Sequence, residues 1–142
     1  MSDAALLVPV FVQILLTIVL HAMMGRARIG SLKRSEVNVE DIVLGQPNWT
    51  TRATQIGNSY HSQHELPVLF FVLIAFILIT KTNGMTFVAL AWLFVVLRFV
   101  HAYIHTTSND INKRFPAYAA GALVLTLMWA LFAAKTLLSF GV

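Results

Sequence analysis

Four long apolar stretches constrain this 142-residue chain more than any other feature of its sequence. An α-helix needs about 20 mainly apolar residues to cross the roughly 30 Å hydrocarbon core of a bilayer. The stretches that reach this length, some with a polar lead-in, cover residues 4–24, 58–80, 85–106 and 116–140. We therefore predict an all-α fold, an integral membrane four-helix bundle of up-down-up-down topology. Residues 1–142 are expected to form a single membrane domain, since no interdomain linker separates the stretches.

The composition excludes a soluble enzyme and a disordered chain. Apolar residues make up 58% of the sequence and charged residues only 11%, whereas an average soluble domain has roughly 25% charged residues. A net charge of +4 is compatible with nucleic-acid binding, but the basic residues lie in loops that flank the apolar stretches. We therefore expect the lipid bilayer, and no nucleic acid, as a partner. Because the chain has no cysteine, it can supply neither a cysteine nucleophile nor a cysteine ligand to a metal.

Basic residues outside the spans predict the orientation in the membrane. The first connecting segment has five of them and the third has two, whereas the second has one. They are Arg26, Arg28, Lys33, Arg34 and Arg52 in the first, Lys113 and Arg114 in the third, and Lys81 in the second. Because Lys and Arg concentrate in cytoplasmic loops, we expect the first and third loops in the cytoplasm and both termini outside. Segment 25–57 is the only long piece expected outside the membrane, and residues 81–84 predict a tight turn.

Ionisable side chains inside or beside membrane spans are costly and usually functional, and here they gather at the cytoplasmic end of the predicted bundle. Helical spacing places them on one face of each of three helices. The residues are Asn58, His61, Ser62 and Glu65 in the second helix, Arg98, His101 and His105 in the third, and Arg114 and Tyr118 in the fourth. Three such faces can surround one anionic polar ligand. The alternative is a structural network between helices, and we expect Glu65 and Arg98 to lie within ion-pairing reach.

Several of these residues occur in motifs that resemble the MAPEG superfamily, the membrane-associated proteins of eicosanoid and glutathione metabolism. The motifs are Glu-Leu-Pro-Val-Leu-Phe at 65–70, Arg-Phe-Val-His-Ala-Tyr-Ile-His at 98–105, and the pair Arg114 and Tyr118. The resemblance covers nearly the whole chain. It implies a homotrimer with sites between subunits, glutathione as co-substrate, a lipophilic small-molecule substrate and, as in bacterial-type members, a place in the bacterial inner membrane. Gln13 agrees with an oligomer, because such a group needs protein neighbours rather than lipid.

The resemblance also implies roles for individual residues. Arg114 matches an arginine that stabilises the glutathione thiolate, which makes it the expected catalytic residue. Glu65 matches a glutamate that holds the glutathione amino group. The other expected binding residues are Arg28 with Arg26 nearby, which match a basic residue that meets a carboxylate, and His61, Ser62, Arg98, His101, His105 and Tyr118. In the second helix the chain departs from the family pattern, because Asn58 and Ser62 stand where arginine and asparagine are usual.

We therefore predict a membrane-bound, glutathione-dependent transferase or peroxidase that activates a thiol at the cytoplasmic end of the bundle for attack on lipophilic electrophiles. A nearby cation favours the thiolate, so no protein nucleophile is needed. Two alternatives stay open. The departures in the second helix favour a non-enzymatic binding or scaffold protein of the same superfamily. Four histidines together with Glu65 would supply ligands to a metal, but the neighbouring arginines would repel a divalent cation, so we expect no metal.

Overall fold

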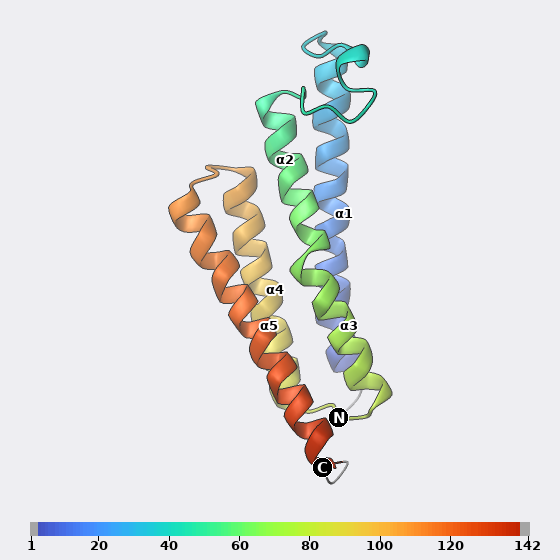
Figure 1. Cartoon of the computed structure of the whole chain (residues 1–142), viewed down its shortest axis with the longest axis vertical. Helices are drawn as coiled ribbons and strands as arrows, with labels where there is room; N and C mark the ends of the chain where they lie inside the picture. Colours follow the sequence, from blue (N-terminus) through green and yellow to red (C-terminus); the bar gives the residue numbers. More distant parts are fainter. Residues whose placement is uncertain (1–2, 140–142) are drawn as a thin grey trace.

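The computed structural model describes residues 3–139, and within this range it consists of helices and connecting loops without any strand. Its elements are α1 (Ala4–Lys33), η1 (Val39–Asp41), α2 (Thr51–His61), η2 (Ser62–His64), α3 (Leu66–Ile79), α4 (Met85–Thr106) and α5 (Ile111–Ser139). Since α2, η2 and α3 follow one another directly, the chain runs up and down through four long helical segments (Figure 1). All four are long and apolar enough to span a membrane, over Ala4–Lys33, Thr51–Ile79, Met85–Thr106 and Ile111–Leu138. The predicted all-α membrane bundle is confirmed.

The tight turn expected between the second and third helices joins α3 to α4. The amide of Lys81 donates to the carbonyl of Leu78 over 3.2 Å, and the amide of Thr82 donates to that of Ile77 over 3.1 Å. This pair of bonds is the Schellman end of a helix, and it requires a left-handed residue. Lys81 supplies that conformation with a φ of 54°. The chain therefore reverses at once, and α3 and α4 form an antiparallel hairpin.

Three helices extend further toward the basic end than the apolar stretches predicted. Helix α1 continues past residue 24 to Lys33, and α2 begins at Thr51 rather than at residue 58. The apolar stretch marks the part of a helix that suits lipid, but Ala, Leu, Arg and Lys continue a helix in water equally well. Thr50 caps α2 by accepting a hydrogen bond from the amide of Ala53 over 3.3 Å. The segment outside the helices narrows to 34–50, and the α1–α2 hairpin projects beyond the α4–α5 turn (Figure 1).

The ends of α5 also differ from the prediction. We expected this helix to begin at Pro116, but it begins at Ile111 and Pro116 lies inside it. Pro116 removes the helical hydrogen bond to the carbonyl of Asn112, and because Asn112 lies in the exposed first turn, water can bind that carbonyl instead. The predicted end at residue 140 lies outside the described residues.

A break interrupts the second long helical segment between α2 and α3. Residues 62–64 form a 3-10 turn, and Glu65 leaves the helical conformation with φ −99° and ψ −102°. Pro67 explains the break, because it has no N–H for the carbonyl of Gln63 and its ring crowds that carbonyl. The regular helical face that we predicted for the second helix is therefore interrupted where the polar residues lie.

The apolar core fills the half of the bundle nearest the termini. Its buried side chains come from α1, α3, α4 and α5, and the rings of Phe70 and Phe94 stack at 4.7 Å between centroids. A second and smaller apolar cluster consists of Leu16, Leu20 and Ala102, and it holds α1 against α4. The apolar core thus packs the helices together next to the more polar half of the bundle.

A buried amide pair joins α1 to the break in the second segment. The Nε2 of Gln13 donates to Oε1 of Gln63 over 3.1 Å, and the Nε2 of Gln63 donates to the carbonyl of Ser59 over 3.0 Å. Gln13 is 0% exposed and Gln63 is 1% exposed. The expectation that Gln13 needs protein neighbours is confirmed, although its partner lies in the same chain.

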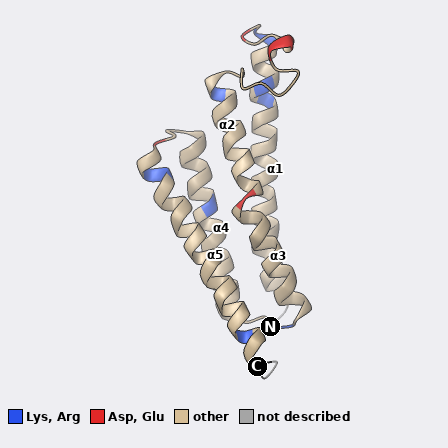
Figure 2. Cartoon of the chain, viewed as in Figure 1, with Lys and Arg blue, Asp and Glu red and all other residues tan. Residues whose placement is uncertain are grey.

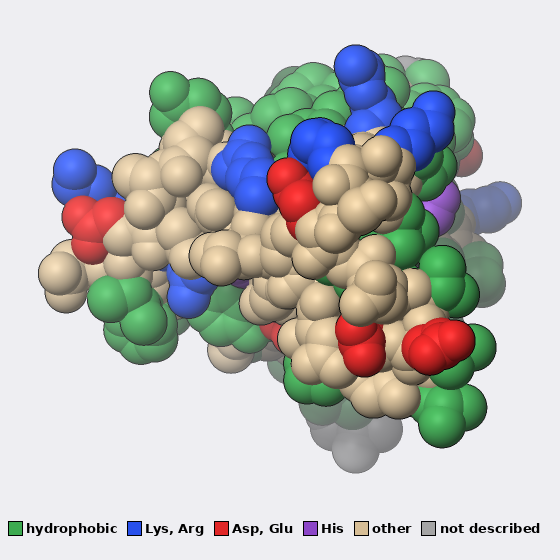
Figure 3. Space-filling model, turned by 90° about the horizontal axis from the view of Figure 1, so that it is seen from above, with side chains coloured by type: hydrophobic (Ala, Val, Ile, Leu, Met, Phe, Trp, Pro, Cys, Tyr) green, Lys and Arg blue, Asp and Glu red, His purple; other side chains and the backbone are tan. Residues whose placement is uncertain are grey.

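The outer faces of the bundle are apolar, and the charges gather toward one end. Large side chains such as Phe11, Ile18 and Val96 are more than half exposed, as expected for residues that contact lipid. Figure 2 shows Lys and Arg mainly in the half that carries the 34–50 segment. Seen from that end, basic side chains lie across the surface with a few acidic ones between them (Figure 3). This distribution is the basis of the predicted orientation, which stays a prediction.

Candidate functional site

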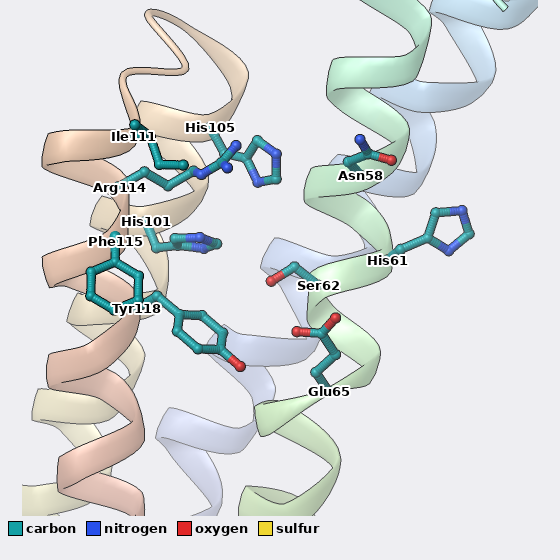
Figure 4. A pocket seen from close by; sticks show the side chains of 10 residues that line it. All are labelled: Asn58, His61, Ser62, Glu65, His101, His105, Ile111, Arg114, Phe115 and Tyr118. Carbon is teal, nitrogen blue, oxygen red and sulfur yellow. The ribbon is translucent and has the colours of Figure 1, made fainter. Parts of the chain in front are cut away.

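An open cavity of about 410 Å³ lies between the α2–η2 segment and the α4–α5 pair (Figure 4). It is lined by Asn58, His61, Ser62, Glu65, His101, His105, Ile111, Arg114, Phe115 and Tyr118. The three helical faces that the sequence predicted to converge therefore border one space.

The α4 side of the cavity presents two histidine rings. His101 and His105 are one helical turn apart, their ring centroids are 5.4 Å apart, and both rings point into the cavity (Figure 4). They are only 4% and 7% exposed. The Nδ1 atoms of both rings are buried and have no hydrogen-bond partner among the described residues. Because these Nδ1 atoms are not accessible to solvent, the two rings border the cavity through their other ring atoms.

Arg114 extends from the first turn of α5 and runs beside His105 at the mouth of the cavity (Figure 4). Its Nη1 donates to Oδ1 of Asn109, which lies in the α4–α5 turn with a φ of 52°. Asparagine adopts this left-handed conformation more readily than most residues. Among the described residues Arg114 forms no ion pair with a carboxylate. Its positive charge is therefore available to an anion in the cavity.

The end of α4 is held in place by two side chains of α2. Gln55 Nε2 donates to the carbonyls of His105 and Thr107 over 2.7 and 3.1 Å, and Arg52 donates to the carbonyl of Thr106. The last carbonyls of a helix have no partner within the helix, so these bonds satisfy them. They tie α2 to the turn of α4 that carries His105 and thus fix the width of the cavity at this end.

The opposite wall carries the hydroxyl of Ser62 and the carboxylate of Glu65. Both groups point toward the cavity, and the hydroxyl of Tyr118 points across it toward Glu65 (Figure 4). His61 borders the cavity but its ring points away from it, and Asn58 lies above them on α2 (Figure 4). The wall therefore offers one negative charge and one hydroxyl.

The prediction that Glu65 and Arg98 lie within ion-pairing reach is wrong. Arg98 is 1% exposed, as predicted for a residue that faces the bundle, but its Nη2 donates to the carbonyl and Oγ of Ser62, each over 3.0 Å. The ion pairs within the described residues are Arg34–Glu36 and Lys113–Asp110. The reason for the difference is the 3-10 turn, which presents both oxygens of Ser62 to Arg98 and leaves Glu65 exposed beside the cavity. Arg98 itself does not line the cavity.

The two arginines of α1 are separate from this cavity. The guanidinium carbon of Arg28 lies 4.8 Å from the ring centroid of Trp49, a cation–π contact. Arg28 and Trp49 border a second cavity of about 310 Å³, which shares Asn58 and His61 with the first. Arg26 is exposed and lines neither of these two cavities. Within one chain the structure thus does not bring the α1 arginines together with Arg114.

Sequence reasoning missed two residues that line the cavity and one that holds its arginine. Ile111 and Phe115 are 63% and 64% exposed, and they form an apolar rim on the α5 side. Their spacing of i, i+4 and i+7 with Tyr118 places all three on one helical face, and this signal was available. Asn109, which binds Arg114, lies in a turn, so no helical spacing pointed to it.

The histidines are divided between two places, which bears on the metal alternative. The ring of His64 packs edge-to-face against that of Tyr60, with centroids 4.7 Å apart, and His64 does not line the cavity that His101 and His105 border. Within residues 3–139, no three His, Cys, Asp or Glu side chains are grouped so that they could hold a metal ion. What the first cavity does offer is one cation, one carboxylate and several neutral polar groups beside an apolar rim. Such a set suits a small zwitterionic or anionic ligand next to an apolar one.

The comparisons with known proteins agree with this architecture. The model of the MAPEG family matches residues 6–134, which is most of the chain and includes every residue of the cavity. No curated protein and no solved structure matches the chain.

Proposed function

This chain belongs to the MAPEG family of membrane proteins, and on that premise we propose that it is a glutathione-dependent transferase or peroxidase acting on lipophilic electrophiles. The family supports a general role in glutathione or eicosanoid metabolism. The proposal goes further, because it assigns the thiol to the cavity between α2 and the α4–α5 pair and makes Arg114 its catalytic residue.

The observation that carries the proposal is the guanidinium of Arg114 at the cavity mouth, which has no carboxylate partner among the described residues and lies beside the rings of His101 and His105. A cysteine-type thiol has a pKa near ~8.5, so most of it is protonated at neutral pH. A cation within ~4–6 Å lowers such a pKa by ~1–3 units. The first turn of α5, which carries Arg114, adds the partial positive charge of a helix start. Bound glutathione would therefore be largely thiolate.

The chemistry then needs no nucleophile from the protein. The thiol proton passes to water, the thiolate sulfur forms a bond to an electrophilic carbon, and the leaving group departs with the bonding electron pair. In a peroxidase reaction two thiols are oxidised to a disulfide while a lipid hydroperoxide is reduced to an alcohol and water. The exposed rim of Ile111 and Phe115 lies where a substrate dissolved in the bilayer would approach the sulfur.

We include in the proposal a homotrimer and a cavity that opens to the cytoplasm. In each of the four spans, no more than 39% of the 18-residue apolar stretch is buried within one chain. The remaining surface is available for contacts with further copies. A neighbouring copy could bring its own Arg28 to the open side of the cavity, as the family resemblance implies. The cavity lies at the basic end of the bundle, which the positive-inside rule assigns to the cytoplasm.

The test is binding of glutathione to the purified protein, measured by the ultraviolet absorbance of the thiolate and by equilibrium dialysis. Saturable binding that generates thiolate at neutral pH is the expected result. Binding without thiolate, or no binding at saturating concentrations, would contradict the proposal and favour the non-enzymatic scaffold, for which the neutral side chains of Asn58 and Ser62 provide the argument.

A further inference from the structure

The turn between α4 and α5 carries a carboxylate close to Arg114, yet the two groups do not pair. Asp110 lies four residues before Arg114, a spacing at which opposite charges commonly pair on a helix. Its Oδ1 instead accepts a hydrogen bond from the amide of Asn112 over 2.9 Å, and its Oδ2 lies 3.9 Å from Nζ of Lys113. Asp110 therefore caps the start of α5 and pairs with Lys113, and neither residue lines the cavity.

Arg114 is held by a neutral side chain of the same turn. Its Nη1 donates to Oδ1 of Asn109, and the amide of Asn109 donates to the carbonyl of Ile104 over 2.8 Å at the end of α4. Asn109 thus connects the last turn of α4 to the first turn of α5. A long arginine side chain otherwise has many conformations. Because an amide oxygen has no net charge, this bond limits the movement of the guanidinium and does not neutralise it.

Asn109 lies beside the cavity and does not line it. It borders an adjoining cavity of about 300 Å³, which shares Asn58 with the first. The turn is also fastened to α2, because Gln55 Nε2 donates to the carbonyl of Thr107 over 3.1 Å. These bonds lie within one chain, so they do not depend on how copies of the chain assemble. Asn109 can therefore influence a ligand of the first cavity through the guanidinium that it holds.

We propose that Asn109 is a positioning residue, which holds the Arg114 guanidinium at the cavity mouth without neutralising it. This inference rests on the proposed function, because the charge of Arg114 is what would stabilise a bound thiolate. A carboxylate at position 109 would form a charge-assisted bond with the same guanidinium and offset most of its charge. The order of Asn109 and Asp110 in the turn therefore matters, since the reverse order would place the carboxylate on Arg114.

The main test is the same substitution at two positions. Asn109→Asp places a carboxylate against Arg114. Asn112→Asp adds the same charge on an exposed residue that does not line the cavity, and it does not face Arg114 because it lies two residues away on the helix. Relative to this control, Asn109→Asp should raise the pKa of the bound glutathione thiol by about 1 unit, which is about a tenfold loss in its ionisation constant. The measurement is thiolate absorbance against pH at saturating glutathione.

Two further variants test the order of the turn and the role of the amide. The double variant Asn109→Asp/Asp110→Asn keeps the net charge, and asparagine caps a helix start about as well as aspartate. Its thiol pKa should rise by about as much as in Asn109→Asp. Asn109→Gly keeps the turn, since glycine readily adopts the φ of 52° found at this position. The guanidinium is then less fixed, so a roughly threefold loss in the thiol's ionisation constant is expected.

The outcomes separate this inference from the proposed function. Equal thiol pKa values in Asn109→Asp and Asn112→Asp, with thiolate formed by the unmodified protein, would overturn the inference and leave the function standing. An unchanged thiol pKa in Asn109→Gly would also overturn it, because the amide would then not position Arg114. Thermal unfolding in detergent identifies any variant that does not fold, and the remaining variants then decide. If the unmodified protein forms no thiolate with glutathione, the proposed function fails and the inference fails with it.

Discussion

The half of the bundle near the termini and the half near the basic loops are built on different principles. Near the termini, rings such as Phe70 and Phe94 are 0% exposed and fill the space between the helices. Beyond the break at Glu65, the buried side chains include Arg98 and His101, and several of their polar atoms have no partner among the described residues. An unsatisfied buried donor or acceptor costs about 1–3 kcal/mol. The first half therefore stabilises the fold, whereas the second half buries polar groups at a cost in stability and places Glu65, Arg114 and two histidines around a cavity.

Removing the cation of the polar half should have the largest effect. If Arg114 lowers the bound thiol's pKa by ~2 units from ~8.5, Arg114→Ala should reduce the thiol's ionisation constant by about 10²-fold, or ~2.7 kcal/mol, and the amount of thiolate at pH 7 by about 25-fold. Because Arg114 depresses this pKa, its contribution is present between the lowered and the free value and disappears as pH rises toward ~9. The measurement is thiolate absorbance with glutathione from neutral to alkaline pH, where the variant should be rescued.

Two further variants make the Arg114 test specific. Lys113→Ala removes a neighbouring charge whose side chain is 72% exposed and which does not line the cavity, so it should leave the thiolate signal intact. His105→Phe should weaken binding without rescue at high pH, because it removes a hydrogen-bonding ring and not the cation. Equal thiolate signals in the Arg114 and Lys113 variants would show that thiolate formation does not depend on Arg114.

Creating a cavity in the apolar half of the bundle should reduce thermal stability and leave glutathione binding unchanged. Phe94 is 0% exposed and stacks on Phe70. Because the helices remain in an apolar detergent when they separate, the cavity term dominates Phe94→Ala, and roughly 2 kcal/mol of the free energy of unfolding should be lost. Thermal unfolding in detergent measures this loss. Phe11→Ala, at a ring that is 63% exposed, is the control, and an equal loss there would contradict the assignment of a closed core.

The buried amide pair at the boundary between the halves should contribute less. Gln63→Leu leaves the Nε2 of Gln13 without its acceptor, and interhelical hydrogen bonds within membranes contribute about 1 kcal/mol. We expect a loss of that size in the free energy of unfolding, with partial recovery in the double variant Gln13→Leu/Gln63→Leu, because no amide is then left unpaired. A double variant that is as unstable as the sum of the two single variants would contradict this coupling.

The smallest effect is expected outside the bundle, at the ion pair of Arg34 and Glu36. The hydrogen bond from the Arg34 guanidinium holds the pKa of the Glu36 carboxyl below its usual value. Any stabilisation by this pair is therefore present above the carboxyl's ordinary pKa and is lost as pH falls through the lowered one. Because both groups are exposed to water, Glu36→Gln should leave thermal stability unchanged at neutral pH. A clear loss would show that the 34–50 segment has a larger role.

Much of this architecture was readable before the fold was known. The four spans, the tight turn at Lys81 and the family all followed from local signals, namely apolar length, turn chemistry and short motifs. The gathering of Ser62, Glu65 and the α4 histidines around one cavity was also predicted, because helical spacing decides which residues share a face. These features depend on neighbours within a few turns, so the amino-acid sequence contains them directly.

Other features depended on how the helices meet. Helical spacing could not predict that Arg98 would bind Ser62 and not Glu65. The choice depends on the helix break at Pro67, which places Ser62 in the η2 turn opposite α4. Nor could helical spacing predict that Arg28 would stack on Trp49, since that contact requires the 34–50 segment to fold back onto α1. A hydrogen bond or a charge pair forms only within short distances, and those distances are set by packing between segments far apart in the chain. The sequence alone therefore determined which residues share a helical face, and the tertiary structure decided which side chains those residues bind.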